Sequence, residues 1–126
     1  MEKKDFKYNE KFKQYSLEVD GMQIEIDSFH MTDKTLKLAE GVLKLYPSKL
    51  KEISEYLADA GIFTAFYGDR SPTEVAEKLH EPIIRVNEMG GVLSYTSHEL
   101  DEQHIIELEF VGLFKTFDSI CIDAYA

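Results

Sequence analysis

Tryptophan is absent from this chain of 126 residues, and cysteine occurs only once, at Cys121. A single cysteine cannot form an internal disulfide, which is typical of proteins in a reducing compartment. No apolar run is long enough to span a bilayer, and residues 1–16 lack the apolar segment of a signal peptide. The sequence therefore predicts a cytoplasmic protein that does not enter a membrane.

Positive charge is scarce, with 14 Lys and Arg residues against 24 Asp and Glu residues, for a formal net charge of -10. The imbalance is strongest in residues 97–126, where Lys115 is the one Lys or Arg. Phosphate contacts require Lys and Arg, so such a surface disfavours nucleic acid and anionic lipid. It favours a basic protein partner, although an acidic surface also serves simply to keep a protein in solution.

Sequence signatures of catalysis are missing as well. The chain contains no Gly-x-Ser-x-Gly elbow, no P-loop and no GxGxxG motif. Glu107 and Glu109 lie two apart in an alternating segment, and paired catalytic carboxylates need different surroundings to separate their pKa values. Two glutamates on one wet strand face share their surroundings, so they are interpreted as surface residues. Cys121, inside an alternating segment, is interpreted as a small packed side chain rather than a nucleophile.

Two histidines, His98 and His104, flank the acidic stretch 99–103. Their spacing matches no zinc or calcium loop, and the stretch has no glycine at the sharp turn that a calcium loop needs. We therefore predict a solvated turn, with no metal and no cofactor.

Length and composition fit one ordinary globular domain over residues 1–126, because 44% of the residues are hydrophobic and 30% are charged. The clearest local pattern is at the N-terminal end. Residues 15–19 and 22–26 alternate apolar with polar on either side of Asp20–Gly21, a strong signal for a tight hairpin. This hairpin would pair Val19 with Met22.

The segment 82–124 alternates in the same way and predicts an antiparallel meander of strands at 83–88, 92–96, 105–111 and 117–124. Gly90 and Gly91 are taken as the first turn, which would place Val86 opposite Tyr95. One face of this meander would be apolar and the other wet and mostly acidic.

Helical spacing predicts helices between these two β segments. The first begins near Asp33, and Pro47 would end it or begin the next, which would run to Ala60 with Gly61 as a left-handed cap. Residues 62–67 fit either a short helix or a strand. Ser71 begins a capping box, and the helix that follows stops before Pro82. The fold class is α+β, with two to three helices packed on one face of an antiparallel sheet.

Several segments carry a family resemblance. These are Ser-Pro-Thr-Glu before a helix at 71–74, Glu-Pro-Ile-Ile-Arg-Val at 81–86, the turn 98–104 and Ile-Cys-Ile-Asp at 120–123. This part of the chain, residues 71–123, resembles small bacterial domains of unknown function, some of which are similar to immunity proteins of toxin systems. The resemblance implies an acidic, single-domain cytoplasmic protein and assigns no role to any residue.

The leading hypothesis is a non-enzymatic binding domain for a basic protein, in its sharpest form an immunity-type protein. The candidate partner-binding residues are Glu99, Asp101, Glu102, Glu107, Glu109, Phe114 and Asp123. We expect Tyr67, Phe114 and Phe117 to be exposed, either as a binding patch or as a cluster closing one end of the sheet. Two alternatives stay open: a small-ligand or hydrolase cleft near His98 and His104, and a homodimer joined through a sheet edge.

Overall fold

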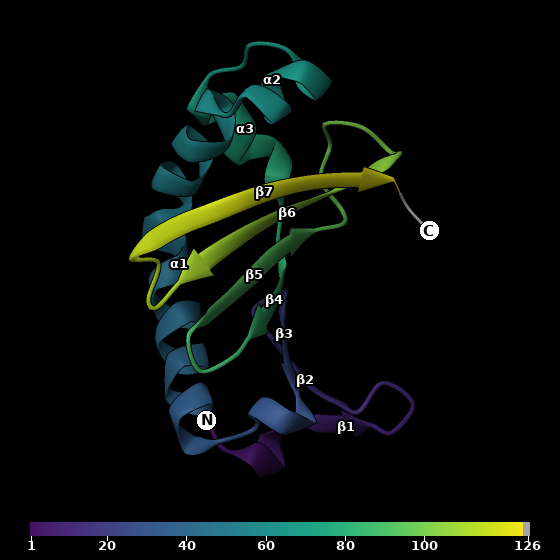
Figure 1. Ribbon diagram of the computed structural model, residues 1–126, viewed down its shortest axis with the longest axis vertical. Helices are drawn as coiled ribbons and strands as arrows, with labels where there is room; N and C mark the ends of the chain where they lie inside the picture. Colours follow the sequence, from purple (N-terminus) through teal and green to yellow (C-terminus); the bar gives the residue numbers. More distant parts are fainter. Residues whose placement is uncertain (125–126) are drawn as a thin grey trace.

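The computed structural model describes residues 1–124 and combines helices with a seven-stranded sheet, which confirms the α+β class. The elements, in chain order, are β1 (Lys7–Asn9), β2 (Gln14–Val19), β3 (Met22–Asp27), α1 (Asp33–Asp59), α2 (Gly61–Tyr67), α3 (Pro72–Leu79), β4 (Ile83–Val86), β5 (Gly90–Tyr95), β6 (His104–Val111) and β7 (Thr116–Ala124). Figure 1 shows α1 running along the molecule behind the strands of the C-terminal meander. No helix in residues 1–124 has the length and apolar character needed to cross a membrane.

The strands lie side by side in sequence order, from β1 at one edge to β7 at the other. Every neighbouring pair is antiparallel except β3 and β4, which are parallel, with Ile24 beside Ile84. The three helices form the connection that parallel neighbours require. The predicted hairpin and meander are therefore parts of one sheet, which is antiparallel as predicted except at this one junction.

The β2–β3 hairpin has the predicted register, with Val19 opposite Met22 and Tyr15 opposite Ile26. Asp20 and Gly21 both have positive φ, of 52° and 85°, as a tight hairpin turn requires. Local turn chemistry and the hydrophobic pattern agree here, so the pairing could be read from adjacent residues.

The predicted β4–β5 register was wrong, because Val86 pairs with Gly91 and not with Tyr95. The turn is formed by Asn87, whose Oδ1 accepts hydrogen bonds from the amides of Met89 (2.8 Å) and Gly90 (3.0 Å). Gly91 instead lies within β5, where a Cβ would overlap the carbonyl oxygen of Arg85. The two glycines allow close strand approach, and the shift by an even number of residues leaves the faces as predicted.

One continuous helix, α1, replaces the two helices predicted around Pro47. Buried residues continue across the proline at spacings of three and four: Thr35, Ala39, Val42, Tyr46, Ile53 and Leu57, with half-buried Leu50 between them. Core packing of this uninterrupted stripe outweighs the loss of one backbone hydrogen bond at Pro47. Gly61 is not the predicted left-handed cap, because Ala60, in an extended conformation, caps α1 and Gly61 begins α2.

Of the two conformations left open for residues 62–67, the structure has the helix, as part of α2. At α3, the Ser71 hydroxyl accepts a hydrogen bond from the Glu74 amide (3.2 Å), as expected of an N-cap. The Glu74 carboxylate pairs with Arg70 at 2.7 Å.

The hydrophobic core combines residues of all three helices with alternate residues of the sheet. The core side of the sheet, called here the inner face, carries Ile24, Ile84, Leu93, Ile106 and Leu108, all 0% exposed. Contacts of α1 with β4 and of α2 with β7 link the helical layer to the sheet. That all helices cover this one face stays a prediction.

Candidate functional site

The candidate residues lie in three places. Three of them are on β6 and β7: Glu107, Glu109 and Asp123. Their side chains lie on the opposite face of the sheet from the buried aliphatic residues of these strands. Glu99, Asp101 and Glu102 lie in the loop 96–103 between β5 and β6, and Phe114 lies in the turn between β6 and β7. The strand residues belong to one continuous surface, whereas the loop residues and Phe114 do not.

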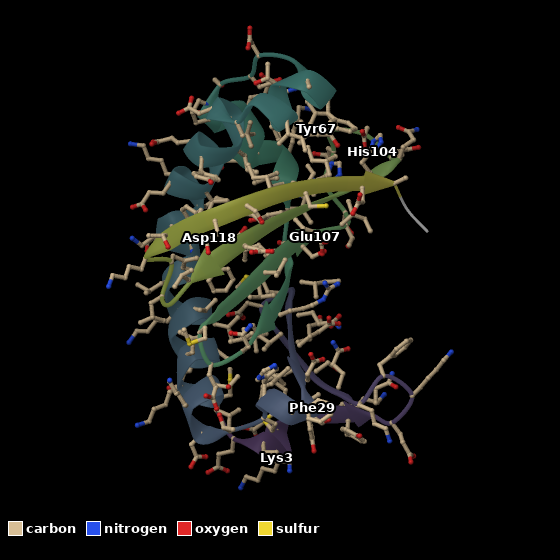
Figure 2. All side chains as sticks on the ribbon, in the orientation of Figure 1. Lys3, Phe29, Tyr67, His104, Glu107 and Asp118 are labelled. Carbon is tan, nitrogen blue, oxygen red and sulfur yellow. The ribbon has the colours of Figure 1, made fainter. Side chains whose placement is uncertain are left out.

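That surface is the sheet face opposite the inner face, and it is lined with carboxylates along β2, β3, β6 and β7. We call it the outer acidic face and define it by Glu18, Glu25, Asp27, Glu107, Glu109, Asp118 and Asp123. Within β2–β7, Arg85 is the one Lys or Arg. Figure 2 shows Glu107 and Asp118 on the side of the sheet turned toward the viewer.

Arg85 links the two halves of this face. Its Nε lies 3.3 Å from Glu25 Oε1 on β3, and its Nη1 lies 3.2 Å from Glu107 Oε2 on β6. Because β5 runs between β4 and β6, the second ion pair passes across β5. Glu25 is further held by the side-chain amides of Gln14 (3.3 Å) and Gln23 (2.7 Å). The remaining carboxylates of the outer acidic face have no base against them among the described residues.

Ser94 lies on β5 directly opposite Glu107 and is only 1% exposed although it belongs to the outer face. Its hydroxyl has no hydrogen-bond partner in residues 1–124. The Arg85–Glu107 ion pair passes over this part of β5, which accounts for the burial. A buried hydroxyl without a partner loses its hydration and gains nothing in return.

A small pocket of about 100 Å³ opens on the outer acidic face beside Arg85. Its lining includes Glu25, Asp27, His30 and Asn87, which come from two segments far apart in the sequence. Sequence reasoning confined to the C-terminal meander missed Glu25, Asp27 and Arg85. The alternation of residues 22–27 already placed these two carboxylates opposite the apolar side, but nothing local showed that β3 lies beside β4.

The two histidines of the loop are held by local hydrogen bonds. His98 Nδ1 accepts from the amide of Leu100 (3.1 Å), so its Nε2 donates to the carbonyl of His104 (2.7 Å). His98 is therefore neutral, its side chain is buried, and neither ring nitrogen is left for a metal or a substrate. We predicted a turn open to solvent, but at His98 the turn is buried and is held by hydrogen bonds within the loop.

Asp101 organises the rest of this loop. It binds His104 Nδ1 at 2.7 Å and accepts the backbone amides of Gln103 (3.2 Å) and His104 (3.1 Å). Desolvation acts to raise its pKa, but the hydrogen bonds from His104, Gln103 and Tyr67 together lower it. The described part of the chain has five surface hollows whose linings are known, and none of these linings includes His98, Asp101 or His104. In residues 1–124, no group of three or more His, Cys, Asp or Glu residues is arranged to hold a metal ion.

Phe114 is not the exposed aromatic residue that was predicted, because it is 3% exposed. Its ring packs against Phe110 (4.7 Å between centroids), Tyr46 (6.3 Å) and Phe117 (6.4 Å). Tyr67 and Phe117 are half-buried. The ring contacts of Phe114 therefore fit the second interpretation, a cluster that closes one end of the sheet, better than a binding patch.

Cys121 is exposed on the outer face, so the prediction of a packed side chain was wrong. Its position opposite Glu107 places it among carboxylates. The thiol donates to Asp123 at 3.0 Å, and this bond, with desolvation and the nearby negative charges, raises its pKa. Cys121 is thus a protonated, weakly nucleophilic group.

No protein-family model matches this chain, and neither a curated protein nor a solved structure gives a significant match. Inference about function therefore depends on the residues of the chain and their geometry.

Proposed function

We propose that the protein is a non-enzymatic binding domain that takes a basic protein partner on its outer acidic face. One observation supports this most directly: seven carboxylates from four strands share a sheet face on which Arg85 is the one Lys or Arg of β2–β7. Two of those carboxylates, Glu25 and Glu107, are already paired with Arg85. The unpaired ones are free to meet an incoming cation.

Physical reasoning favours recognition over chemistry on such a face. Uncompensated carboxylates on an exposed sheet face attract a basic protein over about one Debye length, ~8 Å at physiological salt, and speed its encounter. They do not differ enough in surroundings to divide acid and base roles. The sharpest form of the proposal is an immunity-type protein that neutralises a basic toxin in the cytoplasm, where Cys121 would stay reduced.

A charge-reversal pair tests this proposal against a matched control. Glu109→Lys with Asp118→Lys reverses two exposed carboxylates of the outer acidic face that form no ion pair within residues 1–124. Glu55→Lys with Asp59→Lys makes the same change in net charge on the exposed side of α1. Each protein is used to capture partners from an extract of its own cells across a salt series, and bound proteins are identified by mass spectrometry.

We expect a basic protein that the wild type and the α1 control retain and that the outer-face variant releases. Rising salt should weaken this capture, because charge steering is screened. Equal capture by both variants would contradict recognition through this face, and so would the absence of any basic protein. Light scattering on the same samples measures whether β7, the longer edge strand, instead joins two copies of the chain.

A further inference from the structure

A separate pocket of about 280 Å³ lies between α1, α3 and the β2–β3 turn. We call it the α1–α3 pocket. Its apolar lining includes Met22, Tyr46 and Leu50, and no residue of the outer acidic face takes part in it. Figure 1 shows α3 beside α1, and these two helices are in contact. A volume of this size is close to the lower end of the range for small-ligand pockets.

Carboxylates surround this apolar lining. Asp20, Glu77 and Glu81 line the pocket and are exposed, and no Lys or Arg is among the lining residues. His80, also in the lining, has its Nε2 2.9 Å from Glu99 Oε2. The pocket therefore offers negative charge next to apolar surface, which complements a cation carried on an apolar stem.

Tyr46 adds a hydrogen-bond donor that the protein does not use. Its hydroxyl lies 2.7 Å from that of Tyr95, and the two phenols contain two protons for this one bond. The fully buried Tyr95 hydroxyl has no other hydrogen-bond partner in the described part of the chain, so Tyr95 must donate and Tyr46 accept. The proton of Tyr46, a residue only 6% exposed, is then left without an acceptor.

Tyr46 is one of the residues that line the α1–α3 pocket. Burial raises the pKa of Tyr46 to about 12, the bond from Tyr95 opposes that shift, and the charge of Glu81, another lining residue, adds to it. Tyr46 thus stays protonated and can donate at any physiological pH. A ligand oxygen that accepts this proton would complete the hydrogen bonding of the Tyr46–Tyr95 pair.

We propose that the α1–α3 pocket binds a small organic cation in which an ammonium group and an oxygen acceptor are separated by an apolar chain. The ammonium group faces Asp20, Glu77 and Glu81, the chain covers Met22 and Leu50, and the oxygen accepts from Tyr46. This site is independent of partner binding on the outer acidic face, since the two share no residue.

Three probes of nearly equal size test the proposal on the full chain. They are 5-aminopentan-1-ol, which has both groups, n-pentylammonium, which lacks the oxygen, and pentane-1,5-diol, which lacks the charge. Binding is followed by NMR through the methyl groups of Met22, Leu50 and Ala76, all in the lining. We expect the amino alcohol to saturate with a dissociation constant on the order of 1 mM, and each other probe to bind several-fold more weakly.

Two variants locate the binding. Ala76→Leu fills the pocket without changing charge and should abolish saturation, whereas Glu77→Gln should weaken it about threefold. Glu55→Gln, the same change on an exposed part of α1 outside the pocket, should leave it unchanged. The proposal is overturned if either single-function probe binds as tightly as the amino alcohol, if Ala76→Leu retains wild-type affinity, or if no lining methyl group shifts.

Discussion

The two faces of the sheet differ sharply although the same strands supply both. On β6, Ile106 and Leu108 are fully buried, while Glu109, between Leu108 and Phe110 in sequence, is exposed. Alternation along a strand sends neighbours to opposite faces, so one backbone carries two independent chemistries. Stability resides mainly on the inner face, which leaves the outer face free to change its charge.

Neighbouring truncations on β6 should show the largest contrast. Leu108→Ala removes a fully buried side chain from the core and should lower the free energy of unfolding by roughly 2–5 kcal/mol. Glu109→Ala should change it by no more than about 0.5 kcal/mol. Urea unfolding of both variants measures the difference, and similar losses would mean that the outer face is also part of the core.

Arg85 is the exception on the outer face, because it connects Glu25 and Glu107. Arg85→Gln should cost about 1 kcal/mol of unfolding free energy, since it leaves two carboxylates without their shared cation. Lys49→Gln breaks a single pair with Glu52 on α1 and should cost only about 0.4 kcal/mol. If denaturation in low and high salt shows no greater loss for Arg85, the network adds nothing beyond single pairs.

Ser94 offers a change in the opposite direction. Ser94→Ala removes a buried hydroxyl that has no partner in residues 1–124, so it should raise the free energy of unfolding by about 1 kcal/mol. Ser119→Ala, on exposed β7, serves as the control and should change little. Thermal unfolding of the two variants checks this, and a destabilised Ser94→Ala protein would show that the hydroxyl is in fact hydrogen bonded.

The rate at which Cys121 is alkylated measures the effect of the neighbouring negative charges on its thiol. Only the thiolate is alkylated, and the hydrogen bond to Asp123 with nearby charges raises the thiol pKa, so iodoacetamide should react slowly at pH 8. Asp123→Asn lowers that pKa toward its ordinary value and should speed alkylation about threefold. Glu55→Gln, on α1, should not change the rate; an equal rate in both variants would remove Asp123 as the cause.

Much of the fold could be predicted because its signals are local. The Asp20–Gly21 turn and the alternation around it gave the β2–β3 register directly. Alternation also gave both faces of the meander, even where the predicted register was wrong. The predicted β4–β5 register was wrong because two adjacent glycines can either form a turn or allow close approach of neighbouring strands. Only the positions of Phe110 and Arg85 on the adjoining strands show that Gly90 and Gly91 do the second.

Other features depend on contacts between distant segments. The apolar stripe of α1 continues through Pro47, a signal present in the sequence that the proline obscured. The ion pair of Arg85 with Glu25 forms only because β4 lies beside β3. The α1–α3 pocket forms only because α3 packs on α1. No pattern within a few residues of sequence predicts such contacts. Cys121 pairs with Glu107 across β6 and β7, so both side chains lie on the outer face. The prediction of a packed cysteine considered only that it lies in a strand, and not which face of the strand it is on.

The parallel junction of β3 and β4 has a consequence for how the chain folds. The hairpin on one side and the meander on the other can each begin from turns of a few residues, whereas their junction must wait until the whole stretch 28–82 has returned to the sheet. Closing so long a loop is entropically slow, so we expect the two halves to order early and to join late. The outer acidic face, which spans that junction, would then exist only in the finished protein.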